Sequence, residues 1–218
     1  MITTAWLVAR KDLLIEARSR VLIWQVVPFG VMALLLSGLA LGPTRAGHSG
    51  AGPGLFYLVT LLVAILMINR NRAIESSPGT HASVATLGLD PAGVFLGKTL
   101  ALAVELWVTA AVLLAGAVLV LHLPLGATLS AAPSVLVTVA ALAAAGTLYG
   151  ALTGGDASAT LLPVLSLPAF APLLIAGERS LSAAVTHQGL WQWWVLDVVA
   201  LVAYLAIGIL LYAVLEET

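Results

Sequence analysis

Four histidines and a cluster of tryptophans are the side chains whose types suit metal ligation and aromatic stacking. The histidines are His48, His81, His122 and His187. Neutral imidazole is a common axial ligand of haem iron, so each of them is a candidate ligand. Three of the six tryptophans follow the last histidine, and they are Trp191, Trp193 and Trp194. They are a candidate face for haem or for a partner protein. The alternative is solvated loop histidines and an interfacial aromatic belt.

Two further groups of residues interrupt apolar stretches of the sequence. Glu105 is a candidate pathway residue or subunit contact, because a carboxylate in hydrocarbon must be paired, protonated or in a polar cavity. Alternatively, it lies close enough to the surface to be wetted. Pro163, Pro168 and Pro172 predict a bent or discontinuous helix, since each removes a backbone donor. This helix is a candidate gate, and the alternative is a static kink. We expect Asp197 at a membrane interface.

One short motif resembles a phosphate-binding loop. The stretch from Gly93 to Thr99, with Gly97 and Lys98, resembles the pattern G-x-x-x-x-G-K-[ST], but it has three residues between its glycines instead of four. No strand precedes it, and an apolar helix follows it. The phosphate-binding loop wraps backbone N–H groups around phosphate, which this context does not provide. We therefore predict that any ATP is bound by another subunit.

The composition identifies the class of protein. Hydrophobic residues make up 61% of the 218 residues and charged residues 9%, whereas soluble domains average about 45–50% and about 25%. The net charge of −1 gives no bias toward nucleic acid. The absence of cysteine excludes disulfides and zinc–cysteine sites. We predict an integral membrane protein with no metal site and no catalytic constellation.

The spacing of charges predicts an all-α, polytopic membrane protein with one transmembrane permease domain over 1–218. A bilayer core of about 30 Å needs about 20 helical residues for each crossing. Apolar periodicity over 3–20 predicts an amphipathic helix on the membrane surface. Six transmembrane helices are predicted, at about 21–41, 53–69, 99–121, 134–152, 157–177 and 193–215. Seven Lys or Arg residues fall in the inner segments and two in the outer ones, which predicts that both termini are cytoplasmic.

The longest polar interval, residues 69–98, connects the second and third predicted spans and cannot cross the membrane. Pro78 and Gly79 break the chain, and Thr80 is a candidate N-cap for a short cytoplasmic helix that ends near Leu87. Such a helix would be a natural coupling contact for a cytoplasmic partner. The alternative is an ordinary solvated loop with an incidental helix.

Residues of this interval carry a resemblance to a known family. Glu75, Gly79, Thr80, Leu87, Pro91 and Lys98 occur in the family's order Glu…Gly-Ser/Thr…Leu…Pro…Lys. The proline-interrupted run at 162–177 is similar to a second family segment. The chain thus resembles the haem exporter protein B family (CcmB), membrane subunits of type-2 ABC exporters in cytochrome c maturation. It departs from the family in its acidic residues, since Glu75 stands alone before the glycine and Ala82 replaces a common Glu.

The resemblance implies a non-catalytic permease in the bacterial inner membrane, with a second copy of itself and a separate cytoplasmic ABC ATPase subunit. The ATPase contact would include Glu75, Gly79, Thr80, Leu87 and Lys98. Further implied partners are a Trp-rich haem-handling membrane protein and a periplasmic haem chaperone, with haem as a substrate rather than a covalently bound cofactor. The alternatives are a scaffold that couples ATP hydrolysis to chaperone release, an exporter of another substrate and, with least support, an intramembrane enzyme.

Overall fold

The computed structural model describes residues 1–42, 50–75, 90–152 and 158–216, and within these ranges all the regular secondary structure is helical. The helices are α1 (Ile2–Ser19), η1 (Leu22–Val26), α2 (Val27–Leu41), α3 (Ala51–Glu75), α5 (Pro91–Val120), α6 (Leu125–Leu152), α7 (Ser158–Val185) and α8 (Trp191–Glu216). Element η1 is a π-helical turn that runs directly into α2. The all-α prediction is therefore confirmed for the described part of the chain.

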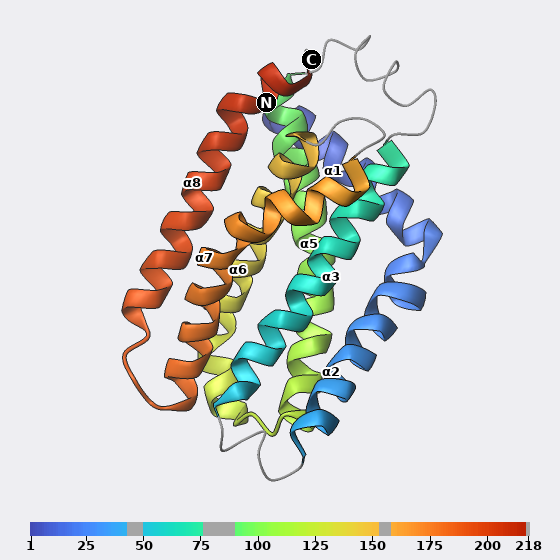
Figure 1. The fold of residues 1–218 in the computed structure, drawn as a ribbon. Coiled ribbons are helices and arrows are strands. Elements are labelled where there is room, and N and C mark those ends of the chain that lie inside the picture. Colours follow the sequence, from blue (N-terminus) through green and yellow to red (C-terminus); the bar gives the residue numbers. More distant parts are fainter. Residues whose placement is uncertain (43–49, 76–89, 153–157, 217–218) are drawn as a thin grey trace.

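The long helices form an up-and-down bundle, with α1 across one end (Figure 1). Both termini lie at that end, and the end of α2, the start of α3 and the connections from α5 to α6 and from α7 to α8 lie at the other. Five helical segments are long and apolar enough to cross a bilayer: Leu22–Leu41, Ala51–Arg72, Pro91–Val120, Leu125–Leu152 and Trp191–Tyr212. The chain is therefore a multi-pass membrane protein.

The fifth predicted span corresponds to α7, which is not among those five segments. Figure 1 shows that α7 is bent, with its first part running across the bundle and its second part along it. The prediction that this helix is bent is thus confirmed. The helix is nevertheless continuous from Ser158 to Val185.

Helix α6 forms the centre of the bundle and packs against α3, α5, α7 and α8. Its alanine- and glycine-rich segment explains this position, because small residues allow helix backbones to approach closely in membranes. Residues 141–146 are all buried, and Gly146 packs against the Ile68 side chain of α3. In contrast, α2 and α8 expose long rows of leucine, isoleucine and valine, which is favourable only in lipid or against another apolar surface.

Several helices are longer than the membrane spans predicted for them. Helix α3 continues to Glu75, and α5 begins at Pro91 rather than near residue 99. Asp90 precedes Pro91, which occupies the first helical turn, where its missing N–H costs nothing. Helix α6 begins at Leu125, with Pro133 inside it. The predicted limits followed the charges and prolines that end each apolar run, but these helices continue past those residues.

Candidate functional site

A buried ion pair joins the surface helix α1 to the end of α3. The Arg70 guanidinium on α3 lies 2.5 Å from the Glu16 carboxylate on α1, and Glu16 is 6% exposed. The second Glu16 oxygen accepts the Leu22 backbone N–H at 2.7 Å, so it also satisfies a donor at the start of the first span. Arg70 additionally donates to the Ser19 hydroxyl at 3.0 Å. One carboxylate therefore fixes both the turn after α1 and its contact with α3.

The next residue on α3 extends this polar cluster toward the core. The Asn71 side-chain amide donates to the Glu105 carboxylate of α5 at 3.4 Å. Glu105 is 3% exposed, so the alternative that it is wetted at the membrane surface is wrong. Instead, it links α5 to α3 below the Glu16–Arg70 pair. We name Glu16, Ser19, Arg70, Asn71 and Glu105 the inner polar cluster.

The glycines of the motif that resembles a phosphate-binding loop seat α1 on α5. A Cβ at residue 93 would lie 2.9 Å from the Met1 carbonyl oxygen, and one at residue 97 would lie 2.6 Å from that of Ala5. Real Cβ atoms do not approach so closely, so only glycine permits this packing. Residues 93–99 lie inside α5, where backbone N–H groups serve the helix. The motif is therefore a helix-packing surface, and its rejection as an ATP site is supported.

The same turn of α5 also contacts the end of α8. The Lys98 ammonium donates to the Tyr212 hydroxyl at 3.0 Å and lies 5.7 Å from the centre of its ring. Phe95 packs into the notch that Gly208 leaves on α8. The start of α5 is thus held between α1 and α8. Lys98, predicted to contact an ATPase, lies two turns inside α5 and is half-buried.

The remaining residues predicted for ATPase contact lie largely outside the described part of the chain. Gly79, Thr80 and Leu87, and with them the predicted coupling helix, fall outside the described residues, as does the side chain of Glu75 at the end of α3. What the structure does describe are the two helix ends that flank this segment. The Glu16–Arg70 pair joins α3 to α1, and the two glycines pack α5 on α1, so both helices that flank this segment contact α1.

A second buried carboxylate joins α6 to α8 toward the other end of the bundle. Asp197 is 0% exposed and lies six residues after the start of α8, so its side chain packs inside the bundle near this end, and its position at a membrane interface stays a prediction. The Ser134 hydroxyl donates to one of its oxygens at 2.5 Å, and the Thr138 hydroxyl lies 3.0 Å from the other. Two hydroxyls on the facing helix satisfy the carboxylate, which explains how it is accommodated inside the bundle.

The candidate gate residues lie apart from Glu105. Helix α7 packs on α3, α6 and α8, whereas Glu105 lies between α3 and α5. Pro168 and Pro172 are exposed on the outside of α7, and Pro163 lies in the part of α7 whose side chains are not described. Beside the bend, the Tyr204 hydroxyl of α8 donates to the Ala169 carbonyl at 2.8 Å. The structure therefore does not bring the predicted pathway residues together.

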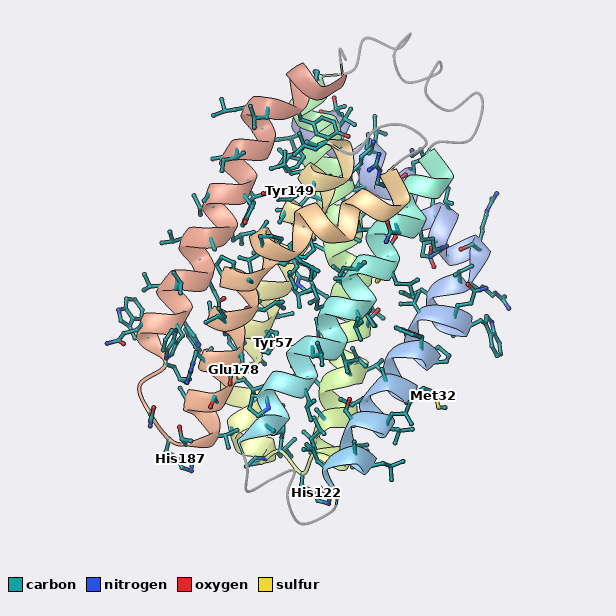
Figure 2. All side chains as sticks on the ribbon, viewed as in Figure 1. Met32, Tyr57, His122, Tyr149, Glu178 and His187 are labelled. Carbon is teal, nitrogen blue, oxygen red and sulfur yellow. The ribbon has the colours of Figure 1, made fainter. Side chains whose placement is uncertain are left out.

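The candidate haem face lies at the end of the bundle opposite the termini. His187 is in the loop between α7 and α8, and Figure 2 shows it at the same end as His122. Trp191 is 75% exposed, whereas Trp193 and Trp194 are half-buried. The two other histidines, His48 and His81, fall outside the described residues. No group of three or more metal-binding side chains occurs among the residues that the structure describes.

The inner polar cluster was only partly accessible from the sequence. Glu105 is identifiable from its isolation in an apolar stretch, whereas Glu16 and Arg70 were not singled out from the sequence. Glu16 lies seven residues after Ala9, the most buried residue of α1, and so falls on the same face. This seven-residue spacing could have indicated that Glu16 is buried on the same face of α1 as Ala9.

Comparison with known proteins places the chain in a family. The family model described as CcmB protein matches residues 3–214. Among curated proteins, heme exporter protein B of Rhodobacter capsulatus is 32% identical over 159 residues, which is 71% of this chain. The aligned part spans 66% of that relative's length.

Proposed function

Since this chain belongs to the CcmB family of haem exporter B proteins, we propose that it is the permease subunit of an ABC transporter complex. The complex handles or exports haem in the biogenesis of c-type cytochromes, and a separate cytoplasmic ATPase subunit drives it. The permease itself is not an enzyme. The glycine-rich stretch at 93–99 is helical and packs on α1, which supports the assignment of ATP binding to a partner.

The observation that supports this function most strongly is the joint between α1, α3 and α5. The segment 76–89 lies between α3 and α5, and the Glu16–Arg70 pair and the glycines at 93 and 97 fix these two helices to α1. A force applied by an ATPase at this segment therefore moves three elements together. Residues Glu75, Gly79, Thr80 and Leu87 form the proposed ATPase contact.

The proposed orientation places this joint in the cytoplasm and the protein in the bacterial inner membrane. Both termini lie at the same end as the joint (Figure 1). The natural chain has no cysteine, so single cysteines report accessibility without background. We expect Thr80→Cys to react with a membrane-impermeant maleimide only in inverted vesicles, and His187→Cys only in intact spheroplasts. The opposite result for both positions would refute the orientation.

The partner assignment is tested by co-expression with the cognate ATPase subunit. We expect the wild-type permease to co-purify with the ATPase and to raise its ATP turnover, and Thr80→Asp to weaken both because it adds charge at the contact. Ser130→Asp, an exposed change at the other end of the bundle, is the matched control. Equal effects of the two variants would contradict the proposed contact. The same preparation shows whether two copies of the permease are present.

The side proposed to meet haem or its chaperone is the opposite end, with His187, Trp191, Trp193 and Trp194. Trp191 is the most accessible of these side chains. We expect Trp191→Ala to reduce cross-linking to the Trp-rich haem-handling membrane protein or to the periplasmic chaperone. Trp24→Ala, an exposed tryptophan near the other end, is the control. If the two variants behave alike, the tryptophan cluster is only an interfacial belt.

A scaffold that does not transport is the second candidate function, and one observation favours it. The two carboxylates inside the bundle, Glu105 and Asp197, are buried and hydrogen-bonded, and neither lines an open path in the described structure. Sealed vesicles that contain the complex distinguish the two functions. ATP-dependent haem accumulation supports transport, whereas ATP-driven chaperone release without haem crossing supports the scaffold. Transport of a different compound would support an exporter with another substrate.

A further inference from the structure

A groove between α3 and α7 lies near the end of the bundle opposite the termini. Its volume is about 260 Å³, below the roughly 300–1,000 Å³ typical of pockets that enclose a drug-sized ligand. Its walls include Leu58, Leu61, Leu174 and Ile175. The groove is therefore sized for one slender apolar segment rather than for a flat macrocycle.

Polar groups occur at only part of this groove. Glu178 lines it and is partly exposed, and Arg179, which is not part of the lining, is exposed next to Glu178 on α7. The Arg179 guanidinium is 3.5 Å from the Glu178 carboxylate, a loose exposed pair that contributes little and leaves both charges available to a ligand. Seven residues separate Glu178 from the end of α7 at Val185, or about 10 Å along the helix axis. The carboxylate therefore lies near the depth of lipid head groups.

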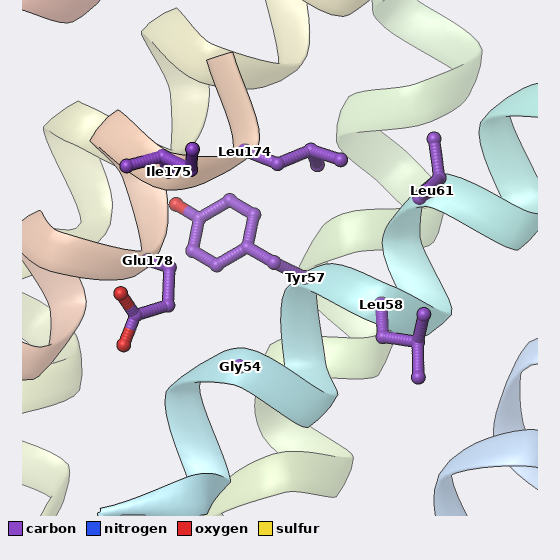
Figure 3. A pocket seen from close by; sticks show the side chains of 7 residues that line it. All are labelled: Gly54, Tyr57, Leu58, Leu61, Leu174, Ile175 and Glu178. Carbon is purple, nitrogen blue, oxygen red and sulfur yellow. The ribbon is translucent and has the colours of Figure 1, made fainter. Parts of the chain in front are cut away.

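The Tyr57 ring forms the inner wall of the groove. Figure 3 shows the ring reaching from α3 toward α7, with Ile175 and Glu178 beside it. The glycine at 177 makes this approach possible, because a Cβ there would lie 2.6 Å from the ring. The Tyr57 hydroxyl is buried, so the ring offers a ligand an apolar surface and not a donor. The groove thus combines apolar walls with one carboxylate, that of Glu178.

We propose that this groove binds one phospholipid with an ammonium head group, a phosphatidylethanolamine, from the adjacent leaflet. One acyl chain lies along Leu58, Leu61, Leu174 and Ile175. The ammonium donates to Glu178 and the phosphate lies beside Arg179, so each charge of the zwitterionic head group meets a side chain of the opposite sign. Phosphatidylglycerol lacks the cation, and the quaternary amine of phosphatidylcholine has no N–H to donate. This inference does not depend on the substrate of the complex.

Native mass spectrometry of the full-length protein, delipidated in detergent and titrated with dioleoyl lipids, tests the proposal. We expect phosphatidylethanolamine to bind about tenfold more tightly than phosphatidylglycerol or phosphatidylcholine, the effect of one charge-assisted hydrogen bond. Glu178→Gln should remove this preference and leave binding of all three lipids similar.

A second pair of variants separates the groove from the general lipid-facing surface. Leu61→Trp fills the groove and should abolish retention of the tight lipid, whereas Leu129→Trp on the exposed side of α6 should not. Equal binding of the three lipids to wild type would overturn the proposal, as would a preference that survives Glu178→Gln. Retention of no lipid by wild type, because a second copy of the chain covers the groove, would also overturn it. So would displacement of the bound lipid by haem at equimolar concentration.

Discussion

Removal of the Glu16 carboxylate is the sharpest test of how α1 is held to the bundle. In Glu16→Ala, Arg70 loses its ion partner while its side chain stays largely buried, and the Leu22 N–H loses its acceptor. Breaking one side of a buried pair costs about 3–5 kcal/mol, because the remaining charge is uncompensated. We therefore expect the free energy of unfolding to fall by about that amount. Arg70→Ala should cost a similar amount for the same reason.

The measurement is unfolding of the purified protein in detergent micelles with increasing SDS, followed by circular dichroism. Glu16→Ala, Arg70→Ala and the double variant form a cycle, in which we expect a coupling energy above about 1 kcal/mol. Lys11→Ala provides the matched control, because Lys11 pairs with Asp12 at 2.8 Å on the same helix but is exposed. Its effect should stay within about 0.5 kcal/mol. If Glu16→Ala is no worse than Lys11→Ala, or the cycle is additive, the pair does not hold α1.

Three further predictions use the same unfolding assay. Gly97→Ala should destabilise by about 1–3 kcal/mol because its methyl group meets the α1 backbone, whereas Gly126→Ala, with open space around it, should be neutral; equal effects would mean that α1 is not seated there. Asp197→Ala should cost about 1–3 kcal/mol by removing the acceptor that joins α8 to α6, and exposed Val198→Ala should cost much less. Tyr204→Phe should cost about 0.6–1.7 kcal/mol, the range for interhelical hydrogen bonds in membranes, and no loss would mean that the bend in α7 needs no support from α8.

The apolar spans were predictable because the membrane imposes a length on each of them. Charge-free runs located five helices to within about ten residues at each end, and the prolines located the bent one. The ends of these helices were harder to predict, because a membrane helix continues into the polar region until its backbone is capped. The Asn-Arg-Asn-Arg stretch at 69–72 contains neither glycine nor proline, and the two glycines before Lys98, which are poor helix formers, are accommodated because α1 packs on them.

The contacts of the candidate site were less predictable than the helices. Glu105 was identifiable because a carboxylate among apolar residues needs an explanation, but its partner, Asn71, is separated from it by 34 residues. Gly93 and Gly97 were singled out from the sequence because they resemble part of a phosphate-binding pattern, and not because a helix packs on them. Their role depends on which helix approaches them, and a single sequence does not contain that information.

The short connections opposite the termini have a consequence for biogenesis. The three of them comprise residues 42–50, 121–124 and 186–190, and Arg45 is their single fully charged side chain. In the proposed orientation these are the loops that the insertion machinery must translocate, and moving charge through hydrocarbon is the costly part of that process. The α2–α3 and α5–α6 pairs can therefore enter the bilayer as hairpins with a single charge to carry between them, whereas the α7–α8 pair also carries Glu178 and Arg179 across. The polar segments stay on the ribosome's side.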